Sequence, residues 1–404
     1  MSTAGERDRV LSGMRPTGRL HLGHYHGVLK NWARLQNEYD SFFFVADWHA
    51  LTTHYEDPEI MAANVWDMVI DWLAAGIDPD RATLFIQSRI PQHAELHLLL
   101  SMVTPLGWLE RVPSFKDQQQ RLKDRNLATY GFLGYPLLQS ADILMYRASW
   151  VPVGEDQVPH VELTREIARR FNHIFGKDAE FEEKAEQAVT QLGKQAARSF
   201  RAARQSWLQN GDETARQGAR ELLEAGRNLG AEEKERLLGY LEGGGRTILT
   251  EPEALLTRDS KLSGLDGQKM SKSYNNTINM RDDPDRVAGA IRTMPTDPAR
   301  KRRNDPGDPD KCPVWDLHQI YTEDTVREQL AAGCRSAGIG CLDCKRPLID
   351  AVMEEQVALH ERARPYEEDP GQVRAIIDEG CARAEAVAAE TLREVRDVVG
   401  TVYS

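Results

Sequence analysis

The stretch GRLHLGHYHG, residues Gly18 to Gly27, places three histidines within six residues just ahead of an apolar-periodic segment. That segment has apolar residues at the i, i+3, i+4 and i+7 positions of an amphipathic helix, namely Tyr25, Val28, Leu29 and Trp32. A helix N-terminus offers free N–H groups and the positive end of its dipole to an anion. The stretch therefore predicts a phosphate site, with a solvated histidine-rich loop as the alternative.

Short apolar runs and helical patterns alternate on both sides of this stretch. The predicted strands are FFFVA (42–46), TLFIQ (83–87) and WVPVG (150–154), and a helix ending at a glycine is predicted over 61–76. Such alternation predicts an α/β fold with a doubly wound, Rossmann-like parallel sheet. Ligands of such sheets bind beyond the carboxyl ends of the strands, and His21 to Gly23 lies at a strand-to-helix turn.

The remainder of the chain predicts helices. Residues 178–247 are rich in Ala, Glu, Arg, Lys and Leu and contain no proline, which predicts an insertion of two or three mostly solvated helices. The final segment is also strongly helical and stops at Gly400. We expect a Rossmann-like catalytic domain over 1–177, the charged helical insertion over 178–247, a loop segment completing the site over 248–297, and an all-helical domain over 298–404.

Charge and composition narrow the possible function classes. The 404 residues are 41% hydrophobic and 28% charged, with a formal net charge of −12. This excess of acid argues against bulk coating of nucleic acid but permits a local basic patch. The run Arg300 to Arg303 is one candidate for such a patch, with a solvated face as the alternative. Because the N-terminus has no apolar core and no run reaches the ~18 apolar residues of a membrane span, we expect a cytoplasmic protein with no membrane partner.

A second motif lies about 250 residues further along the chain, at Lys269-Met270-Ser271-Lys272-Ser273. Gly23 lacks a Cβ, so a ligand can approach the backbone closely, and His21 and His24 fall on one side of the first helical turn. The histidines would donate hydrogen bonds to phosphate oxygens. The two lysines would neutralise charge on a departing pyrophosphate. Each motif alone is weak, but both in this order in an α/β chain are specific.

The pair HLGH and KMSKS resembles the HIGH and KMSKS signatures of class I aminoacyl-tRNA synthetases. The resemblance implies that ATP, accompanied by Mg2+, activates an amino acid to an aminoacyl-adenylate and pyrophosphate. The aminoacyl group then passes to the 3′ end of tRNA without a covalent enzyme intermediate. It assigns the catalytic roles to His21, His24, Lys269 and Lys272.

Longer stretches resemble the tryptophanyl-tRNA synthetase family, among them SGMRPTGRLHLGHYHG, VADWHALT, YPLLQSADILMYRA and VPVGEDQVPHVELTREIARRFN. The sister family for tyrosine typically carries GGSDQ where this chain has GEDQ at 154–157. The resemblance therefore implies L-tryptophan and tRNA(Trp) as substrates and a homodimer as the assembly. A paralogue that binds tryptophan and ATP but serves a regulatory partner is the alternative function.

Indole has a single N–H donor, so a selective site needs a buried acceptor for it. Asp142 matches the family's indole-binding aspartate, whereas a solvent-facing position near a helix start is the alternative. The resemblance assigns the other tryptophan contacts to His49, Tyr135, Val151, Val153 and Gln157. It assigns the ATP contacts to Arg15, Pro16, Thr17, Gly23, His24, Lys116, Gly154, Glu155, Asp156, Lys269, Met270, Ser271, Lys272 and Ser273.

Four of the five cysteines lie in one stretch, Cys312, Cys334, Cys341 and Cys344, with the spacing C-x21-C-x6-C-x2-C. Four thiolates in a reducing compartment suit tetrahedral metal ligation, and zinc and an iron–sulfur cluster are both admissible. Scattered structural cysteines are the alternative. A subset of tryptophanyl-tRNA synthetases carries a similar run that binds a 4Fe–4S cluster, so the resemblance implies 4Fe–4S, with Zn2+ second. Cys381 is expected in the core.

Overall fold

The structure is a computed structural model that describes residues 7–56, 58–112, 129–176, 179–225, 229–243, 246–256 and 262–403. Within them, five parallel strands form one sheet in the order β3-β2-β1-β4-β5. The strands are β1 (Arg9–Met14), β2 (Asp40–Val45), β3 (Ala82–Ile86), β4 (Trp150–Val153) and β5 (Glu253–Leu256). The predicted α/β class with a parallel sheet is confirmed.

The three predicted strands correspond to β2, β3 and β4, but β1 and β5 were not predicted. β2 and β3 are almost wholly buried, so both appear in the sequence as continuous apolar runs. β1 instead contains Ser12 and Gly13, and its position is set by its pairing with β2 from Arg9↔Asp40 to Met14↔Val45. β5 is a four-residue edge strand that is half exposed, so it has no apolar signature.

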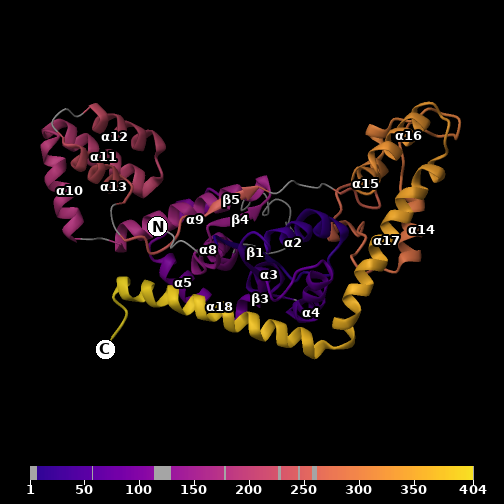
Figure 1. The fold of residues 1–404 in the computed structure, drawn as a ribbon, viewed down its shortest axis with the longest axis horizontal. Coiled ribbons are helices and arrows are strands. Elements are labelled where there is room, and N and C mark those ends of the chain that lie inside the picture. The colour runs from indigo at the N-terminus through magenta and orange to yellow at the C-terminus, as the bar shows by residue number, and fades with distance from the viewer. Residues whose placement is uncertain are drawn as a thin grey trace.

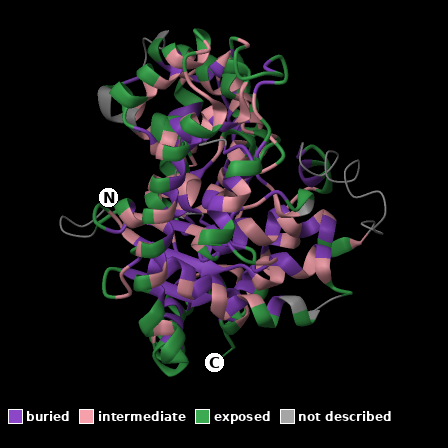
Figure 2. Cartoon of the chain, turned by 90° about the vertical axis from the view of Figure 1, so that its right-hand side faces the viewer, coloured by how far each residue is buried: buried purple, intermediate pink, exposed green. Residues whose placement is uncertain are grey.

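Helices cover both faces of this sheet, and the buried residues concentrate around it (Figure 2). The π-helix η1 sits in the first helical run, where Trp32 stacks on Phe43 of β2 with ring centroids 4.2 Å apart. This packing fixes the run that carries HLGH against the sheet. The helices of this part are α1 (Leu22–His24), η1 (Tyr25–Leu29), α2 (Lys30–Leu35), α3 (Asp47–His54), α4 (Pro58–Ala74), η2 (Gln87–Arg89), α5 (Gln92–Ser101), α6 (Leu106–Glu110), α8 (Tyr130–Met145), η3 (Glu155–Gln157) and α9 (Val158–Phe175).

The inserted segment differs from the prediction of two or three mostly solvated helices. Residues 179–243, as far as they are described, hold four helices that bury a hydrophobic cluster of their own, including Phe200, Trp207 and Leu237. Gly211, at φ 67°, ends α11 before the next helix begins. The helices are α10 (Ala179–Gln191), α11 (Lys194–Asn210), α12 (Glu213–Ala225) and α13 (Ala231–Leu241).

The C-terminal part is helical, as predicted, and its last helix returns to the sheet. Figure 1 shows the insertion and the α15–α16 region at opposite ends of the molecule, with α18 running back along the sheet. Ile377 and Cys381 of α18 join the core of the sheet, which confirms Cys381 as a core residue. The elements are η4 (Lys272–Tyr274), α14 (Pro284–Thr293), η5 (Pro309–Lys311), α15 (Pro313–Tyr321), α16 (Asp324–Arg335), α17 (Cys341–Glu368) and α18 (Pro370–Val399).

Within the described ranges, every helix is too short or too polar to cross a membrane.

We predict that Gly380→Ala destabilises the protein. A Cβ at Gly380 would collide with the backbone carbonyl of Leu84 in β3, so α18 could no longer lie against the strand. The expected loss is about 1–3 kcal/mol, outweighing the helix propensity of alanine. The matched control is Gly218→Ala in α12, where a Cβ meets nothing within 4 Å. Urea unfolding checks both, and equal stability of the two variants would contradict the close packing of α18.

Candidate active site

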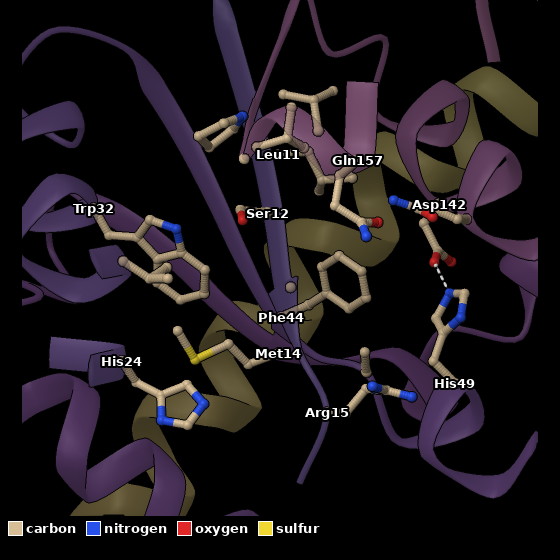
Figure 3. A pocket seen from close by; sticks show the side chains of 18 of the residues that line it. Leu11, Ser12, Met14, Arg15, His24, Trp32, Phe44, His49, Asp142 and Gln157 are labelled. Carbon is tan, nitrogen blue, oxygen red and sulfur yellow. Dashed lines mark hydrogen bonds and ion pairs between the residues drawn. The ribbon is translucent and has the colours of Figure 1, made fainter. Parts of the chain in front are cut away.

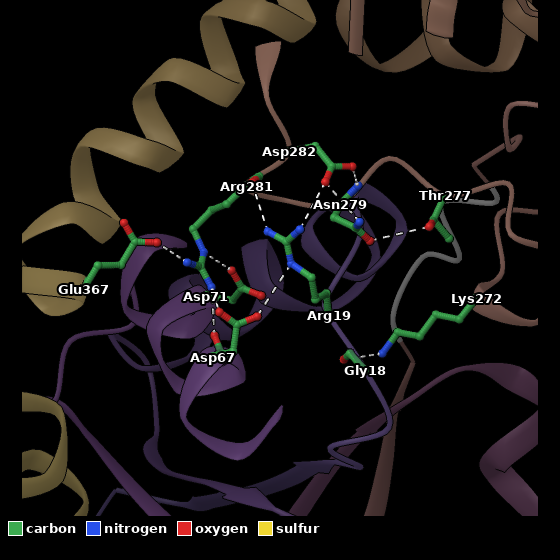
Figure 4. Close-up of polar contacts among 10 residues, drawn as sticks. All are labelled: Gly18, Arg19, Asp67, Asp71, Lys272, Thr277, Asn279, Arg281, Asp282 and Glu367. Atoms are coloured by element: carbon green, nitrogen blue, oxygen red, sulfur yellow. Dashed lines mark hydrogen bonds and ion pairs between the residues drawn. The ribbon is translucent and has the colours of Figure 1, made fainter. Parts of the chain in front are cut away.

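The two sequence motifs meet in the structure. Lys272 Nζ donates a 2.6 Å hydrogen bond to the carbonyl of Gly18 (Figure 4). The N–H of Leu22 donates to the carbonyl of Ile278 at 2.9 Å, and that of Met280 donates to the carbonyl of Leu20 at 2.9 Å. These backbone bonds join the segment before the first helix to the segment after the loop of residues 269–273, which we call the lysine loop. About 250 residues separate the two segments in the sequence.

Two adjoining cavities lie beyond the carboxyl ends of the central strands. One has a volume of about 490 Å³ and the other about 420 Å³. The first reaches toward Asp142, and the second extends between His21 and Lys272. Both are lined by Met14, Arg15, Gly23, His24 and Lys269. The shared lining makes one continuous cleft with an apolar end and a basic end.

The start of the first helical run is shaped by its two histidines. His21 is the N-cap residue, its backbone N–H donates to His24 Nδ1 at 3.2 Å, and the two ring centroids lie 3.8 Å apart. A Cβ on Gly23 would come within 2.9 Å of the His21 ring. Gly23 therefore allows the two imidazoles to share one side of the first turn, as the spacing predicts.

Burial sets the charge of these groups. Burial, followed by the nearby Lys272, lowers the pKa of His21 to about 4. The pKa of His24 is also lowered, by burial, by His21 and by Lys272. Both imidazoles are therefore neutral near pH 7, and each can donate one N–H to a ligand. Burial also lowers the pKa of Lys272 to about 8, against the attraction of Asp71.

Asn276 organises the lysine loop from within. Its side chain accepts a hydrogen bond from the N–H of Ser271 at 2.8 Å and donates to the carbonyl of Lys269 at 3.2 Å and to Asp266 Oδ1 at 2.6 Å. Asn276 is buried, whereas Lys269 is exposed and available to a ligand. Sequence reasoning did not single out Asn276, although an asparagine next to a turn is a typical loop-stabilising residue.

A buried ion network anchors the segment that follows the loop (Figure 4). Arg281 Nε contacts Asp71 Oδ1 at 2.6 Å, and the same guanidinium pairs with Asp67 of α4 and Glu367 of α17. Burial raises the pKa of Asp71 to about 6, although Arg281 opposes this effect. Arg281 thus connects the lysine-loop segment to both the catalytic part and the C-terminal helices. The sequence analysis missed this residue, because no local motif marks it.

Asp142 lies at the apolar end of the cleft and is fully buried in α8, which excludes the solvent-facing alternative. Its carboxylate accepts a hydrogen bond from His49 Nε2 at 2.8 Å (Figure 3) and another from His93 Nδ1 at 2.6 Å. Burial would raise the pKa of Asp142, but the bonds from His49 and His93 outweigh it and lower the pKa to about 2. Gln87 also donates to this carboxylate, and neither it nor His93 was among the predicted residues.

Most of the other predicted site residues line the cleft. The lining includes His49, Tyr135, Val151, Val153, Gln157, Gly154, Asp156, Thr17, Met270 and Ser271. Pro16 is buried beside them in sequence, and Glu155 is exposed. The backbone of Ser273 lies in η4. Lys116 lies outside the described residues.

The four clustered cysteines come from three helix ends. Cys312 precedes α15, Cys334 lies in the last turn of α16, and Cys341 and Cys344 lie in the first turn of α17. Burial, followed by the other three thiols, raises the pKa of Cys344 to about 12, which indicates that the four lie near one another. In the described part of the chain, however, no group of three or more ligating side chains is arranged to hold a metal ion. The predicted metal site is therefore not confirmed.

The basic run after residue 299 does not form a uniform surface patch. Arg300 is buried, and its Nη2 donates to the carbonyls of Arg303 at 2.9 Å and Ile339 at 2.5 Å. Its Nη1 lies 3.8 Å from Cys334 Sγ. Of the four residues in the predicted basic patch, Lys301, Arg302 and Arg303 are exposed and Arg300 is not.

Comparisons with known proteins agree with this geometry. Residues 3–192 and 220–355 match the sequence model of the family described as tRNA synthetases class I (W and Y). The chain is 62% identical to a tryptophan–tRNA ligase of Ralstonia nicotianae over 98% of this chain and 99% of that protein. It is 41% identical to a tryptophan–tRNA ligase of Thermotoga maritima over 98% of this chain and 100% of that protein.

Among solved structures, the chain resembles the tryptophanyl-tRNA synthetase of Campylobacter jejuni complexed with ADP and tryptophan. The TM-score is 0.71 and the identity 27%, over 97% of this chain and 99% of that one. The similarity covers nearly all of both chains, so it includes the helical C-terminal part as well as the sheet.

We predict that binding of ATP weakens as the pH rises through the pKa of Lys272. The ammonium is charged below pH 8 and loses its charge above it, so affinity should fall by about tenfold between pH 7.5 and pH 9.5. His21 and His24 are neutral throughout this range and contribute no titration. The matched variant Lys272→Arg keeps its charge, so its affinity should stay constant. Calorimetric titration checks this, and the same decline in both proteins would assign it to another group.

Proposed function

The chain belongs to the class I tRNA synthetases of the tryptophan and tyrosine family, and from this membership we infer that it is a tryptophan–tRNA ligase. It activates L-tryptophan with ATP and transfers the aminoacyl group to tRNA(Trp). In the first step a carboxylate oxygen of tryptophan attacks the α-phosphorus of ATP, and pyrophosphate leaves. In the second, the 3′-terminal hydroxyl of the tRNA attacks the activated carbonyl carbon, and AMP leaves.

The observation that carries this conclusion is the closure of the two motifs over one cleft. The Lys272 ammonium reaches the carbonyl of Gly18, and Lys269 lines the same cavities as His24. A triphosphate between them would meet two neutral imidazole donors from one side and two ammonium groups from the other. Fixed charges around the bond that breaks stabilise the negative charge developing on pyrophosphate.

For the ATP site, we propose the residues that the family resemblance assigns, with His21, His24, Lys269 and Lys272 in the catalytic roles. Support comes from the position of His21 and His24 at the start of the first helical run, where both line the cleft, and from the absence of a side chain at Gly23. ATP is accompanied by Mg2+, which neutralises part of the phosphate charge. Lys116 is retained as a further proposed phosphate contact.

For the amino acid, we propose Asp142 as the acceptor for the indole N–H, with the ring between Val151 and Val153. This proposal is supported by the burial of Asp142 and by its negative charge, which a neutral donor complements. The remaining proposed contacts are His49, Tyr135 and Gln157. Because a tyrosine ring has no N–H in the indole position, the site favours tryptophan.

We propose that the protein is a homodimer, as the family resemblance implies. Exposed apolar side chains support this, because Leu98 of α5, Met102 directly after α5, Leu106 of α6 and Tyr130 of α8 are all more than half exposed. Such a surface typically marks a protein interface.

A cytoplasmic location is also proposed, since tRNA is used there and all five cysteines are unpaired.

The domain division is likewise a proposal, with 1–177 and 248–297 catalytic, 178–247 the insertion and 298–404 the anticodon-binding part. The separate hydrophobic cluster of the insertion supports the second of these units. The exposed side chains Lys301, Arg302 and Arg303 are our candidates for phosphate contacts, which orient an RNA without reading its sequence.

We propose that Cys312, Cys334, Cys341 and Cys344 bind a 4Fe–4S cluster. Four thiols from three helix ends match its donor set. The choice of this cluster over Zn2+ follows the family resemblance, in which a similar cysteine run binds 4Fe–4S. The nearby Arg300 guanidinium would offset part of the cluster's negative charge. Its role is structural or in tRNA binding.

We predict that Lys269→Ala slows adenylate formation by at least about one hundredfold and leaves tryptophan binding nearly unchanged. Lys269 is exposed and lines both cavities, and it is not among the side chains that hydrogen-bond to Asp142. Tryptophan-dependent ATP–pyrophosphate exchange measures the first quantity, and calorimetry measures the second. Equal loss of both would contradict the assigned role, and exchange without tRNA charging by the wild-type protein would favour the regulatory paralogue.

We predict that protein prepared without oxygen contains iron and sulfide and absorbs broadly near about 400 nm. Cys341→Ser should abolish both the iron and the band, whereas Cys381→Ser should retain them because Cys381 packs in the sheet core. Metal analysis and the ultraviolet–visible spectrum check this independently of activity. Zinc in place of iron would reverse the assignment, and absence of both would exclude the site.

A further inference from the structure

Three protein side chains donate hydrogen bonds to the carboxylate of Asp142. Oδ1 accepts from His93 Nδ1 at 2.6 Å and from Gln87 Nε2 at 2.8 Å. Oδ2 accepts from Gln87 Nε2 at 3.0 Å and from His49 Nε2 at 2.8 Å. A carboxylate has about four lone-pair sites, and three donor atoms already reach both oxygens, so a ligand N–H has to compete with a protein donor.

Two of the three donors to Asp142 are held in place by further hydrogen bonds of their own. Gln87 and His93 are both 0% exposed. The Gln87 Oε1 atom accepts from the N–H of Trp48 at 3.2 Å, which orients its amide toward Asp142. His93 Nε2 lies 2.7 Å from the hydroxyl of Tyr146. With Nδ1 on the carboxylate of Asp142 and Nε2 on the Tyr146 hydroxyl, the His93 ring cannot turn without breaking both contacts.

The third donor faces the cavity. His49 is 8% exposed, lines the larger cavity and comes from α3 on its edge. Figure 3 shows its ring pointing toward the carboxylate of Asp142, and both residues line the larger cavity. Of the three donors, only His49 can therefore be replaced by a group that enters the cavity.

We propose that the His49 N–H occupies the indole-binding lone pair of Asp142 until tryptophan replaces it, while Gln87 and His93 are positioning residues that keep this carboxylate ionised and oriented. This inference rests on the proposed function. Exchange of one N–H for another keeps the same number of donors on the carboxylate in both states. A buried acceptor left without a donor would be costly, and the exchange avoids that cost.

The exchange has a consequence for selectivity. When an analogue without the ring N–H binds, His49 can return to Oδ2, so the analogue leaves no orphaned acceptor. His49 thus limits the discrimination against such analogues. If His49 is removed, the same analogue leaves one lone pair of a buried carboxylate unsatisfied, and discrimination increases.

Loss of His93 has the opposite effect. A buried carboxyl group with fewer internal donors takes up a proton, because burial disfavours its charge. A protonated Asp142 can donate a hydrogen bond and no longer requires an N–H from the ligand. Discrimination therefore decreases when a positioning donor is removed.

The test compares L-tryptophan with β-(benzothien-3-yl)-L-alanine, in which sulfur replaces the ring N–H. The ratio of their kcat/KM values is measured by ATP–pyrophosphate exchange for wild type and variants. We expect His49→Leu to raise the ratio by about tenfold to one hundredfold and His93→Leu to lower it by a similar factor. His93→Asn has the shape of His93→Leu but keeps a donor at the Nδ1 position, so its ratio should remain near the wild-type value.

Gln87→Met should also lower the ratio. Its matched control is Gln36→Met, because Gln36 is a buried glutamine that hydrogen-bonds to backbone at Gly76 and Asp78, away from the cleft. This control should leave the ratio unchanged. A purely structural role of His49 could lower activity on both substrates but could not raise selectivity. The ratio measured for His49→Leu therefore tests the proposed exchange even if His93→Leu does not fold.

An unchanged ratio in His49→Leu, or a ratio that moves in the same direction in His49→Leu and His93→Leu, would overturn the inference. Failure of the wild-type protein to exchange with tryptophan would instead contradict the proposed function. The two failures are therefore distinguishable in one set of measurements.

Discussion

The short antiparallel pairing between the chain around Leu22 and the chain around Ile278 supports the entire phosphate end of the cleft. Two backbone hydrogen bonds of 2.9 Å and the Lys272 contact with Gly18 join segments that come from opposite ends of the catalytic part. Backbone bonds do not depend on side-chain identity, so this pairing fixes the relative position of the two motifs. The side chains can then be selected for chemistry.

Burial sets the charges at one end of the cleft, and hydrogen bonds that oppose burial set them at the other. At the phosphate end, burial keeps the imidazoles of His21 and His24 neutral and brings the pKa of Lys272 to about 8. At the amino-acid end, internal hydrogen bonds keep Asp142 ionised despite complete burial. The cleft therefore places cationic and neutral donors near one cavity and a fixed anion near the other. An amino acid with a neutral N–H and a polyphosphate fit these two environments.

The C-terminal helices are connected to this cleft through polar contacts as well as through the core. Arg281 pairs with residues of α4 and α17, and α18 packs directly on β3. His26, in the first helical run, contacts Tyr321 of α15 at 2.8 Å and Glu355 of α17 at 2.9 Å. The two helices that begin at the clustered cysteines, α15 and α17, thus both contact the first helical run. Ordering of the cysteines by a cluster would stabilise the same helices.

The sequence by itself determined the features that depend on residues close together in the chain. Continuous apolar runs predicted the buried central strands, and the contiguous motifs at 21–24 and 269–273 predicted a phosphate site and its chemistry. Tertiary structure alone decided the rest. β1 and β5 are strands because of their neighbours, Gln87 and His93 act on Asp142 from other elements, and Arg300 is buried against a cysteine rather than exposed to RNA. Each of these depends on contacts between residues far apart in the chain, which no local periodicity or spacing records.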